Sequence, residues 1–557
     1  MIYIHMKIYV SSGATHIELR RSICQITYLN LAQITNCATP TSSTLFNQPA
    51  QLATITFKMP QPARQQVRRV VAGHSRQSKK QFFRPETFFV LLIFVIVIAW
   101  LSVFLGIYLP AANNNTTTSA EDTHHQLLKG SADNSAVSAS EEDFPDHYLT
   151  FSTSCSASQN WQSFMLFFFA HKVNQPGDVI RIASGCSDEQ KQKLEDFHES
   201  VIKKLSPNFH VHFTPDFTKI SGDNYKYYNK PFGVRHFMTH WLKYDESNDR
   251  LKNSIIMILD PDMILLRPLT YDFTSSNVMI HRSERGPPKV KKVMHGQPWA
   301  SLYAFGDGPF KQDLNYVFSN HTDSPALKAT DDERRNNYPG GPPYMATGKD
   351  MWSIVSAWTE LVPNVHHVYK HLLGEMYGWS LGAAHVGLPH TLAESFMISA
   401  TQIGRGEGWQ LIDALKDDEV CEYSVMKEYE DKLPYTMHFC QNYWLGKWFI
   451  GKYRLDSDFL KCDKTLLMEP PKDIAKQFDF YIRPGGKPYG VKEPVRPEVA
   501  KREAFMICQL ISRFNDAAAW FKDTTCEEGT ANHEKSFIFH HSLDPDNNDG
   551  GEKKAKW

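Results

Sequence analysis

The sequence has no excess of charge of either sign. Its 557 residues include 60 lysines and arginines against 61 aspartates and glutamates, which gives a formal net charge of −1. A chain that binds nucleic acid usually carries a basic patch that neutralises phosphates. The balanced charge therefore gives no reason to expect nucleic acid or another polyanion as a partner.

Glycine loops that cradle phosphates are also missing. The sequence contains neither a P-loop nor the Rossmann dinucleotide fingerprint, which disfavours kinases and dehydrogenases. Its nine cysteines include no Cys-x-x-Cys pair and no cysteine–histidine zinc spacing. Seven of these cysteines follow the long apolar run described next. In an oxidising compartment this odd number leaves at least one thiol without an intramolecular partner.

One apolar run is long enough to cross a membrane. Residues 87–108 read TFFVLLIFVIVIAWLSVFLGIY, without a single charge. A bilayer core of roughly 30 Å is spanned by about 20 such residues in a helix. The run is too long, and too far from the first residue, for a cleaved signal peptide. We therefore expect a signal-anchor helix at 87–109.

The charges beside this run predict its orientation. Basic residues dominate before it and acidic residues dominate after it, so the positive-inside rule predicts a type II protein with a cytosolic tail at 1–86. Met59 opens a short basic stretch that suffices as this tail, and we expect residues 1–58 to be an extension of the gene model. The remainder is expected in the lumen of the Golgi, or of the ER and Golgi.

Three regions are expected on the lumenal side. Residues 110–146 are polar and poor in apolar side chains, as in a flexible stem. Residues 147–526 form the expected catalytic domain, and the polar residues 527–557 a disordered tail. Asn114, Asn115 and Asn320 each begin an N-glycosylation triplet.

Strand-like and helix-like segments alternate from residue 147 onward. The expected strands are 147–154, 178–184, 209–213 and 253–260. Helical patterns at 161–173, 188–205 and 231–244 separate them. Apolar strands joined by helices predict an α/β domain with a parallel sheet that is covered on both faces.

The motif that indicates chemistry follows the last of these strands. The run IIMIL leads into Asp260-Pro261-Asp262, and ligands bind at the carboxyl ends of strands in open α/β sheets. Two carboxylates separated by a φ-restricted proline can approach one hard cation. Such a cation stabilises the charge that develops on a departing diphosphate. Asp-x-Asp is also common in turns, so the apolar strand before it carries much of the inference.

Several segments in order resemble the hydroxyproline O-arabinosyltransferases and the related peptidyl-serine galactosyltransferases of plants and algae. The segments that carry the resemblance are FSTSCSASQNWQS (151–163), RIASGCSDEQ (181–190), YYNKPFGVRHFMTHWL (227–242), IIMILDPDMILLRPL (255–269), GPPYMATGKDMWSIVSAWTELV (341–362), GEMYGWSLGAAHVGLPHTL (374–392) and YTMHFCQNYWLGKWFIGKYRLD (435–456). They extend over nearly the whole expected lumenal domain.

The resemblance implies a fold, a donor and an acceptor. The fold is a GT-A-like, Rossmann-type mixed sheet flanked by helices. The donor is a UDP-sugar carrying arabinofuranose or galactose, and Mn²⁺ or Mg²⁺ is the cofactor. The sugar is transferred with retention of configuration to hydroxyproline or serine of a secreted protein.

The resemblance also implies which residues bind the metal. Asp260 and Asp262 are expected at the metal and diphosphate, with Asp262 also assigned to catalysis. His438 is the expected third metal ligand. Without the resemblance, a lone histidine between Met437 and Phe439 is more often a core residue.

Glu375 is the expected acid on the substrate side. It has three open roles: a hydrogen bond to the acceptor hydroxyl, a hydrogen bond to a sugar hydroxyl, or the nucleophile of a double displacement. In the alternative to double displacement, the acceptor approaches from the face of the departing phosphate, whose oxygen takes the proton. A carboxylate on the surface of a helix is the ordinary explanation of such a glutamate.

Four further residues are expected around the donor. Asn229 and Lys230 precede Pro231 at a helix start, which suits a contact with phosphate or uridine. Trp161 and Gln162 are expected to line the donor pocket, although Trp161 also suits an anchor of its helix. Two rival interpretations of the whole chain remain: a tethered glycan- or peptide-binding protein without catalysis, and a transferase that acts on another glycan acceptor.

Overall fold

The computed structural model describes residues 145–537, without 221, 223, 404–405, 423–431, 456–457 and 483–491. The expected tail at 1–86, the signal-anchor helix at 87–109, nearly all of the stem and residues 538–557 lie outside this part. None of the helices within the described residues is both long and apolar enough to span a bilayer.

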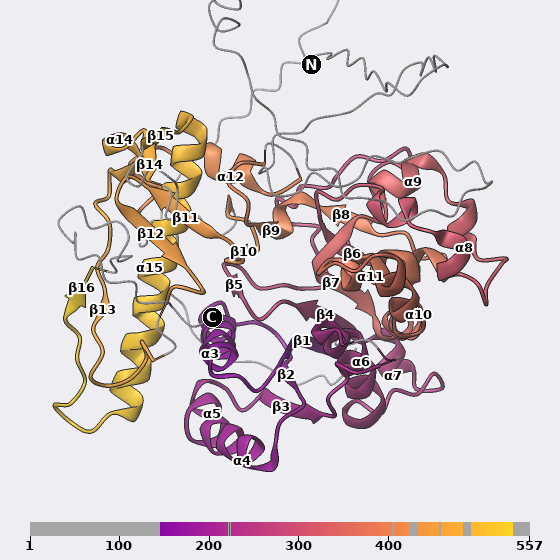
Figure 1. Cartoon of the computed structure of the whole chain (residues 1–557), viewed down its shortest axis with the longest axis horizontal. Coiled ribbons are helices and arrows are strands. Elements are labelled where there is room, and N and C mark those ends of the chain that lie inside the picture. Colours follow the sequence, from indigo (N-terminus) through magenta and orange to yellow (C-terminus); the bar gives the residue numbers. More distant parts are fainter. Residues whose placement is uncertain are drawn as a thin grey trace, which may run out of the picture. The chain divides into compact units, whose positions relative to one another are not determined.

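A seven-stranded sheet organises the described chain (Figure 1). Its strand order is β3-β2-β1-β4-β7-β6-β8. The strands are β1 (His147–Thr153), β2 (Asp178–Ser184), β3 (Phe209–Thr214), β4 (Ile255–Leu259), β6 (Trp299–Leu302), β7 (Gly340–Thr347) and β8 (Thr391–Ala393). β3, β2, β1 and β4 are parallel, whereas β7 is antiparallel to both of its neighbours. The predicted α/β class is confirmed. The sheet is mixed, as the family resemblance implied, and not wholly parallel, as the apolar pattern alone predicted.

Strand β4 is apolar at every position because both of its faces are buried. Ile255, Met257 and Leu259 point into one hydrophobic core, while Ile256 and Ile258 point into a second. Successive side chains of a strand point to opposite faces, so a strand covered on both sides has no position for a polar residue. The first polar side chain, Asp260, appears where the strand ends.

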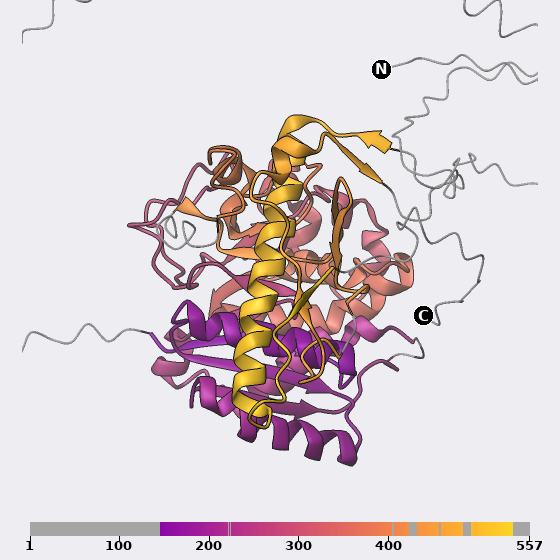
Figure 2. The same ribbon diagram turned by 90° about the vertical axis from the view of Figure 1, so that its left-hand side faces the viewer.

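Different helices cover the two faces. The first core contains residues of α3 (Ala157–Lys172) and α15 (Pro497–Thr525). The second contains residues of α6 (Asn229–His236), α10 (Gly348–Val368) and α11 (Gly374–His385). In Figure 2 the long helix α15 runs along the side of the molecule that faces the viewer. The C-terminal part of the chain therefore completes a core that the N-terminal strands begin.

Shorter elements surround this framework. The remaining strands are β5 (Met263–Leu265), β9 (Met397–Ile398), β10 (Thr436–His438), β11 (Asn442–Leu445), β12 (Trp448–Gly451), β13 (Leu466–Leu467), β14 (Phe480–Ile482), β15 (Lys492–Pro494) and β16 (Lys535–Ser536). The remaining α-helices are α4 (Asp188–Phe197), α5 (Lys203–Leu205), α7 (Asp249–Asn253), α8 (Leu314–Val317), α9 (Asp331–Asn336), α12 (Trp409–Asp413) and α14 (Ile474–Gln477). β16 pairs with β13, although its residues fall in the segment expected as a disordered tail.

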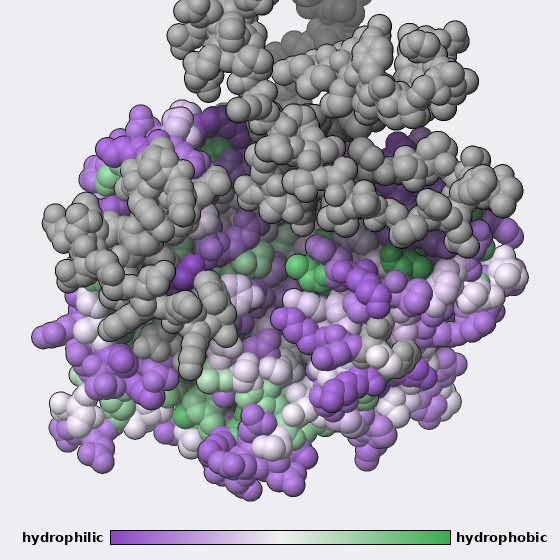
Figure 3. All heavy atoms as spheres, viewed as in Figure 1, coloured by the Kyte–Doolittle hydropathy of each residue, from purple (hydrophilic) through white to green (hydrophobic). Residues whose placement is uncertain are grey.

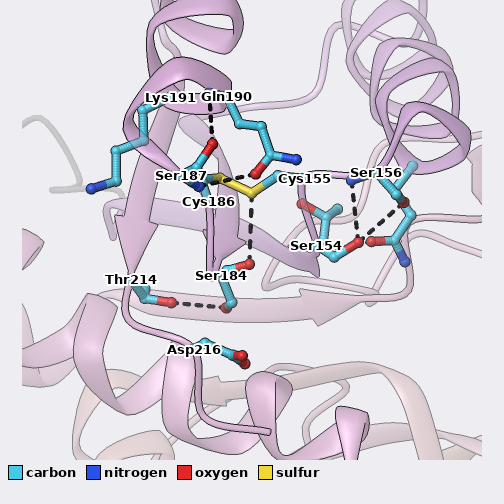
Figure 4. The surroundings of a disulfide bond; sticks show 12 residues. Ser154, Cys155, Ser156, Ser184, Cys186, Ser187, Gln190, Lys191, Thr214 and Asp216 are labelled. Atoms are coloured by element: carbon cyan, nitrogen blue, oxygen red, sulfur yellow. Dashed lines mark hydrogen bonds between the residues drawn. A yellow bond between two sulfur atoms is a disulfide. The ribbon is translucent and has the colours of Figure 1, made fainter.

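Three disulfides join described residues that are distant in the sequence. Cys155–Cys186 links the loops that follow β1 and β2 (Figure 4). Cys421–Cys508 ties a loop to α15, and Cys462–Cys526 joins a loop to the end of the same helix. Cys440 has no disulfide partner. The expected unpaired thiol is therefore present among the seven later cysteines.

The face seen in Figure 3 is mainly hydrophilic where the described residues are coloured, with apolar residues in small groups. Large apolar side chains with substantial exposure are scattered along the chain: Val290, Met294, Tyr316, Leu372, Tyr453 and Met468. Isolated exposed apolar residues are ordinary on soluble domains. Of these six described residues, Tyr453, which is 70% exposed, adjoins a residue of the site described below.

Replacing Cys421 and Cys508 by serine is expected to lower the free energy of unfolding by about 3–5 kcal/mol. The bridge closes a sequence separation of 87 residues, so its loss releases the chain entropy of a long loop in the unfolded state. Thermal and denaturant unfolding of the double variant would measure the change. Cys440→Ser, which removes a thiol without opening a bridge, is the matched control; equal effects in both variants would contradict this account.

Candidate active site

Asp260 and Asp262 lie where the sheet topology changes direction. β1 pairs with β2 on one side and β4 on the other, so the carboxyl end of β4 adjoins the point at which strand order reverses. A turn follows, in which the Met263 amide donates to the Asp260 carbonyl at 3.2 Å. The turn directs both carboxylates toward one region, as the sequence predicts.

His438 reaches this region from a strand far along the chain. β10 pairs antiparallel with β5, with His438 opposite Met263, and the Phe439 amide donates to the Asp262 carbonyl at 3.0 Å. This register places His438 Nε2 3.3 Å from Asp262 Oδ1 and 3.8 Å from Asp260 Oδ2. The other ring nitrogen, Nδ1, is 3.4 Å from the Tyr303 hydroxyl. A partner at Nδ1 fixes the orientation of the imidazole and leaves Nε2 directed at the carboxylates.

These three side chains suit a divalent cation. Ligand atoms of Asp260, Asp262 and His438 all lie within 4.8 Å of one another. Carboxylate oxygens and an imidazole nitrogen are ligands that Mn²⁺ accepts, and Mg²⁺ prefers the oxygens. The side chains of Asp262 and His438 are only 7% and 9% exposed, whereas that of Asp260 is 23% exposed. Solvent and ligands therefore reach the cluster from the side of Asp260.

Lys230 lies beside Asp260, the most exposed of the three residues in the cluster. It is the second residue of α6, and its Nζ donates to Asp260 Oδ1 at 2.7 Å. The same ammonium is 3.4 Å from Glu375 Oε1 and 5.6 Å from the centre of the Tyr344 ring. Burial favours a lower pKa for Lys230, but Asp260 and Glu375 outweigh it and raise the pKa. Lys230 is thus a buried, charged component of the site and not a solvated base.

A second lysine, Lys452, was not predicted from the sequence. It follows β12, and its Nζ donates to Asp262 Oδ2. Burial favours a higher pKa for Asp262, but His438 and Lys452 hold it well below its usual range. Lys452 belongs to no recognisable spacing pattern, because only the tertiary fold brings the β11–β12 hairpin to β4.

Glu375 is buried rather than exposed on its helix. It is the second residue of α11, and its side chain is 6% exposed. Its Oε1 accepts no hydrogen bond of good geometry, so the ammonium of Lys230 at 3.4 Å is an ion-pair neighbour. Burial raises the pKa of Glu375 to about 7, despite the opposing effect of Lys230. A buried carboxyl oxygen that accepts no hydrogen bond is suited to bind a hydroxyl group.

The remaining predicted residues occupy different positions. Trp161 is buried and packs against Phe439 and Phe514 at centroid distances of 5.9 and 5.7 Å, which suits an anchor of α3 next to His438. Gln162 is also buried. Asn229 Oδ1 accepts from the Phe217 amide at 2.8 Å and so holds the loop after β3. Contacts of these residues with a donor stay predictions.

Sequence comparison identifies related proteins. The chain is 26% identical over 335 residues to peptidyl serine alpha-galactosyltransferase of Arabidopsis thaliana, covering 58% of this chain and 34% of that protein. It is 26% identical over 276 residues to the enzyme of the same name from Chlamydomonas reinhardtii, covering 46% and 32%. The chain is a distant homologue of the peptidyl serine α-galactosyltransferases. It spans about a third of the length of these relatives. The homology confirms the predicted relationship to glycosyltransferases.

Other comparisons give weaker results. No family model matches the chain. Among solved structures, the apo structure of the bifunctional glycosyltransferase WbbM aligns with a TM-score of 0.30 and 11% identity, covering 54% of this chain and 46% of that one. The galactosyltransferase LgtC, in complex with donor and acceptor sugar analogues, aligns with a TM-score of 0.28 and 10% identity, covering 53% and 87%.

Glu375→Gln is expected to change how stability depends on pH. A carboxyl group whose pKa rises from 4.5 to about 7 on folding stabilises the folded state below about pH 4.5 and loses this contribution as the pH rises through about 7. Glutamine does not titrate, so the variant should gain about 2–3 kcal/mol relative to the native chain between about pH 5 and about pH 8.

Denaturant unfolding at both pH values, with a chelator present, measures this difference. Glu498→Gln, at an exposed ion pair with Arg496, is the control and should show no such change. A pH-independent difference between the native chain and Glu375→Gln would refute the raised pKa.

Proposed function

We propose that this chain is a divalent-metal-dependent glycosyltransferase that moves galactose from UDP-galactose to serine side chains of secreted proteins. The observation that carries the proposal is the cluster of Asp260, Asp262 and His438 at the carboxyl end of β4, in a chain homologous to peptidyl serine α-galactosyltransferases. A metal-binding cluster at this position suits a ligand with a diphosphate.

The charges around the cluster also favour a nucleotide diphosphate. A bound Mn²⁺ or Mg²⁺ would supply Lewis-acid stabilisation of the leaving diphosphate. Lys230 and Lys452 add two ammonium groups next to the carboxylates. Preorganised cations around a leaving group stabilise its charge without the cost of reorienting water. A binding protein without catalysis has no need of such a concentration of charge.

The surroundings of Glu375 support a positioning role for this residue in the reaction. Its Oε1 is buried and accepts no hydrogen bond, while Lys230 connects it to Asp260. With a pKa of about 7 the carboxyl group is protonated in a large fraction of molecules at neutral pH, which suits a hydrogen bond to a hydroxyl better than nucleophilic attack. We therefore favour attack by the acceptor from the face of the departing phosphate, and retention of the anomeric configuration.

The choice of galactose and serine follows the two relatives. Transfer of arabinofuranose to hydroxyproline is the other outcome that the sequence resemblance allows. A panel of UDP-sugars against peptides that contain serine or hydroxyproline distinguishes the two. The pair that releases UDP in a peptide-dependent manner identifies donor and acceptor.

Asp262→Asn is expected to reduce peptide-dependent UDP release by the full-length protein at least about a hundredfold, because it weakens a ligand that is central to the cluster. Mn²⁺ is supplied in the assay, and its removal by a chelator should have the same effect. Asp249→Asn is the control, since Asp249 pairs with Lys252 beside the other end of β4. Full activity of Asp262→Asn, or no UDP release by the native protein with any pair, would reject the proposal.

We further propose that the domain faces the lumen of the Golgi or of the ER and Golgi. This orientation rests on the charges that flank residues 87–108. Asn320 offers a test, because it lies exposed in a turn after α8 and begins the triplet Asn320-His321-Thr322.

In the lumen, Asn320 is expected to carry an N-glycan. Treatment of the protein from a eukaryotic host with an N-glycosidase should increase its electrophoretic mobility, and part of that shift should vanish in Asn320→Gln. Ser319→Ala, which leaves the triplet intact, is the control. An unmodified Asn320 in intact protein, shown by peptide mass spectrometry, would count against a lumenal domain.

A further inference from the structure

Each carboxylate of the cluster has an ammonium group of its own. Lys230 Nζ is 2.7 Å from Asp260 Oδ1, and Lys452 Nζ donates to Asp262 Oδ2. His438 lies between the two carboxylates, at the oxygens that the lysines do not contact. The order of charged groups is therefore lysine, carboxylate, imidazole, carboxylate, lysine.

Both lysine side chains are largely buried. Their side chains are only 10% and 12% exposed. Lys230 packs over the Tyr344 ring, and Lys452 is 4.9 Å from the centre of the Tyr453 ring. They come from α6 and from the residue after β12, which belong to distant parts of the sequence. Neither ammonium can therefore leave its carboxylate for bulk water without losing packing as well as an ion pair.

The lysines decide the net charge that a ligand meets. Asp260, Asp262 and Glu375 supply at most three negative charges, and the two lysines supply two positive ones. A divalent cation that enters alone would therefore create an excess of positive charge in a poorly solvated site. Charges this close interact strongly at the low effective dielectric constant of a protein interior. A diphosphate carries the opposite charge and removes the excess. The cation and the diphosphate should thus each favour the binding of the other.

We propose that Lys230 and Lys452 make the binding of the divalent metal and of the nucleotide diphosphate mutually dependent. Lys452 contributes most clearly, because its side chain contacts Asp262 and not Glu375. The inference rests on the proposed function, since it assumes that the site takes a metal and a diphosphate. By linkage, the factor by which UDP tightens Mn²⁺ binding equals the factor by which Mn²⁺ tightens UDP binding.

The experiment measures Mn²⁺ affinity of the full-length protein by calorimetry, with and without UDP. The native protein is compared with Lys452→Gln and Lys452→Met, which remove the charge, and with Lys452→Arg, which keeps it. Lys252→Gln is the matched control, because Lys252 forms an ion pair with Asp249 and its side chain is 29% exposed. Thermal melting of each variant establishes that it is folded.

The native protein, Lys452→Arg and Lys252→Gln should bind Mn²⁺ much more tightly when UDP is present. In Lys452→Gln and Lys452→Met, Mn²⁺ alone should bind about tenfold more tightly than in the native protein, because a repelling charge is gone. The enhancement by UDP should fall by about the same factor. A lysine that only supports the fold would not produce these opposite changes.

Two results would overturn the inference. The first is an unchanged effect of UDP on Mn²⁺ affinity in both charge-removing variants. The second is weaker binding of Mn²⁺ alone in those variants, which would make Lys452 a residue that only positions Asp262. Absence of Mn²⁺ binding to the native protein, with or without UDP, would instead refute the proposed function, so the two failures are distinguishable.

Discussion

The site depends on one electrostatic constraint: two neighbouring carboxylates can be buried together only if cationic side chains form ion pairs with them. Asp262 is almost entirely enclosed, and an unpaired buried carboxylate costs several kcal/mol. The ammonium groups of Lys230, in α6, and Lys452, after β12, offset this cost. The helices and hairpins that bear these cations are therefore part of the site, although they are distant from β4 in the sequence.

The position of the site follows from the burial of β4. A strand enclosed on both faces presents no polar side chain until it ends, and β4 ends beside the point where strand order reverses. Polar groups gather there because that edge of the sheet is the first place where they escape both cores. The same arrangement leaves Asp260 more exposed than Asp262, so a ligand can reach the cluster from the side of Asp260.

Much of this organisation could be predicted from the sequence. The strands predicted at 147–154, 178–184, 209–213 and 253–260 agree with β1, β2, β3 and β4 to within two residues at each end, because apolar runs between helical patterns indicate buried strands. The antiparallel direction of β7 could not be predicted from its residues, because a strand that is buried along its whole length is apolar whichever way it runs.

Within the site, some residues could be predicted from the local sequence pattern, whereas the roles of others depend on tertiary contacts. Asp260 and Asp262 follow a recognisable strand, whereas His438 was suggested only by resemblance to a family. The burial of Glu375 and the contact of Lys452 with Asp262 depend on pairings between distant elements. A glutamate near a helix start and a lysine after a glycine look alike whether they are solvated or enclosed.

Helix α15 has a consequence for the order of events during synthesis. Its residue Glu503 accepts hydrogen bonds from the Trp444 amide and the Thr401 hydroxyl, and thereby fixes the hairpin that leads to Lys452. The β11–β12 hairpin precedes α15 in the chain, so it is synthesised before Glu503 is available to contact it. A nascent chain that already contains every charged residue of the site therefore still lacks the contacts that hold the hairpin in place.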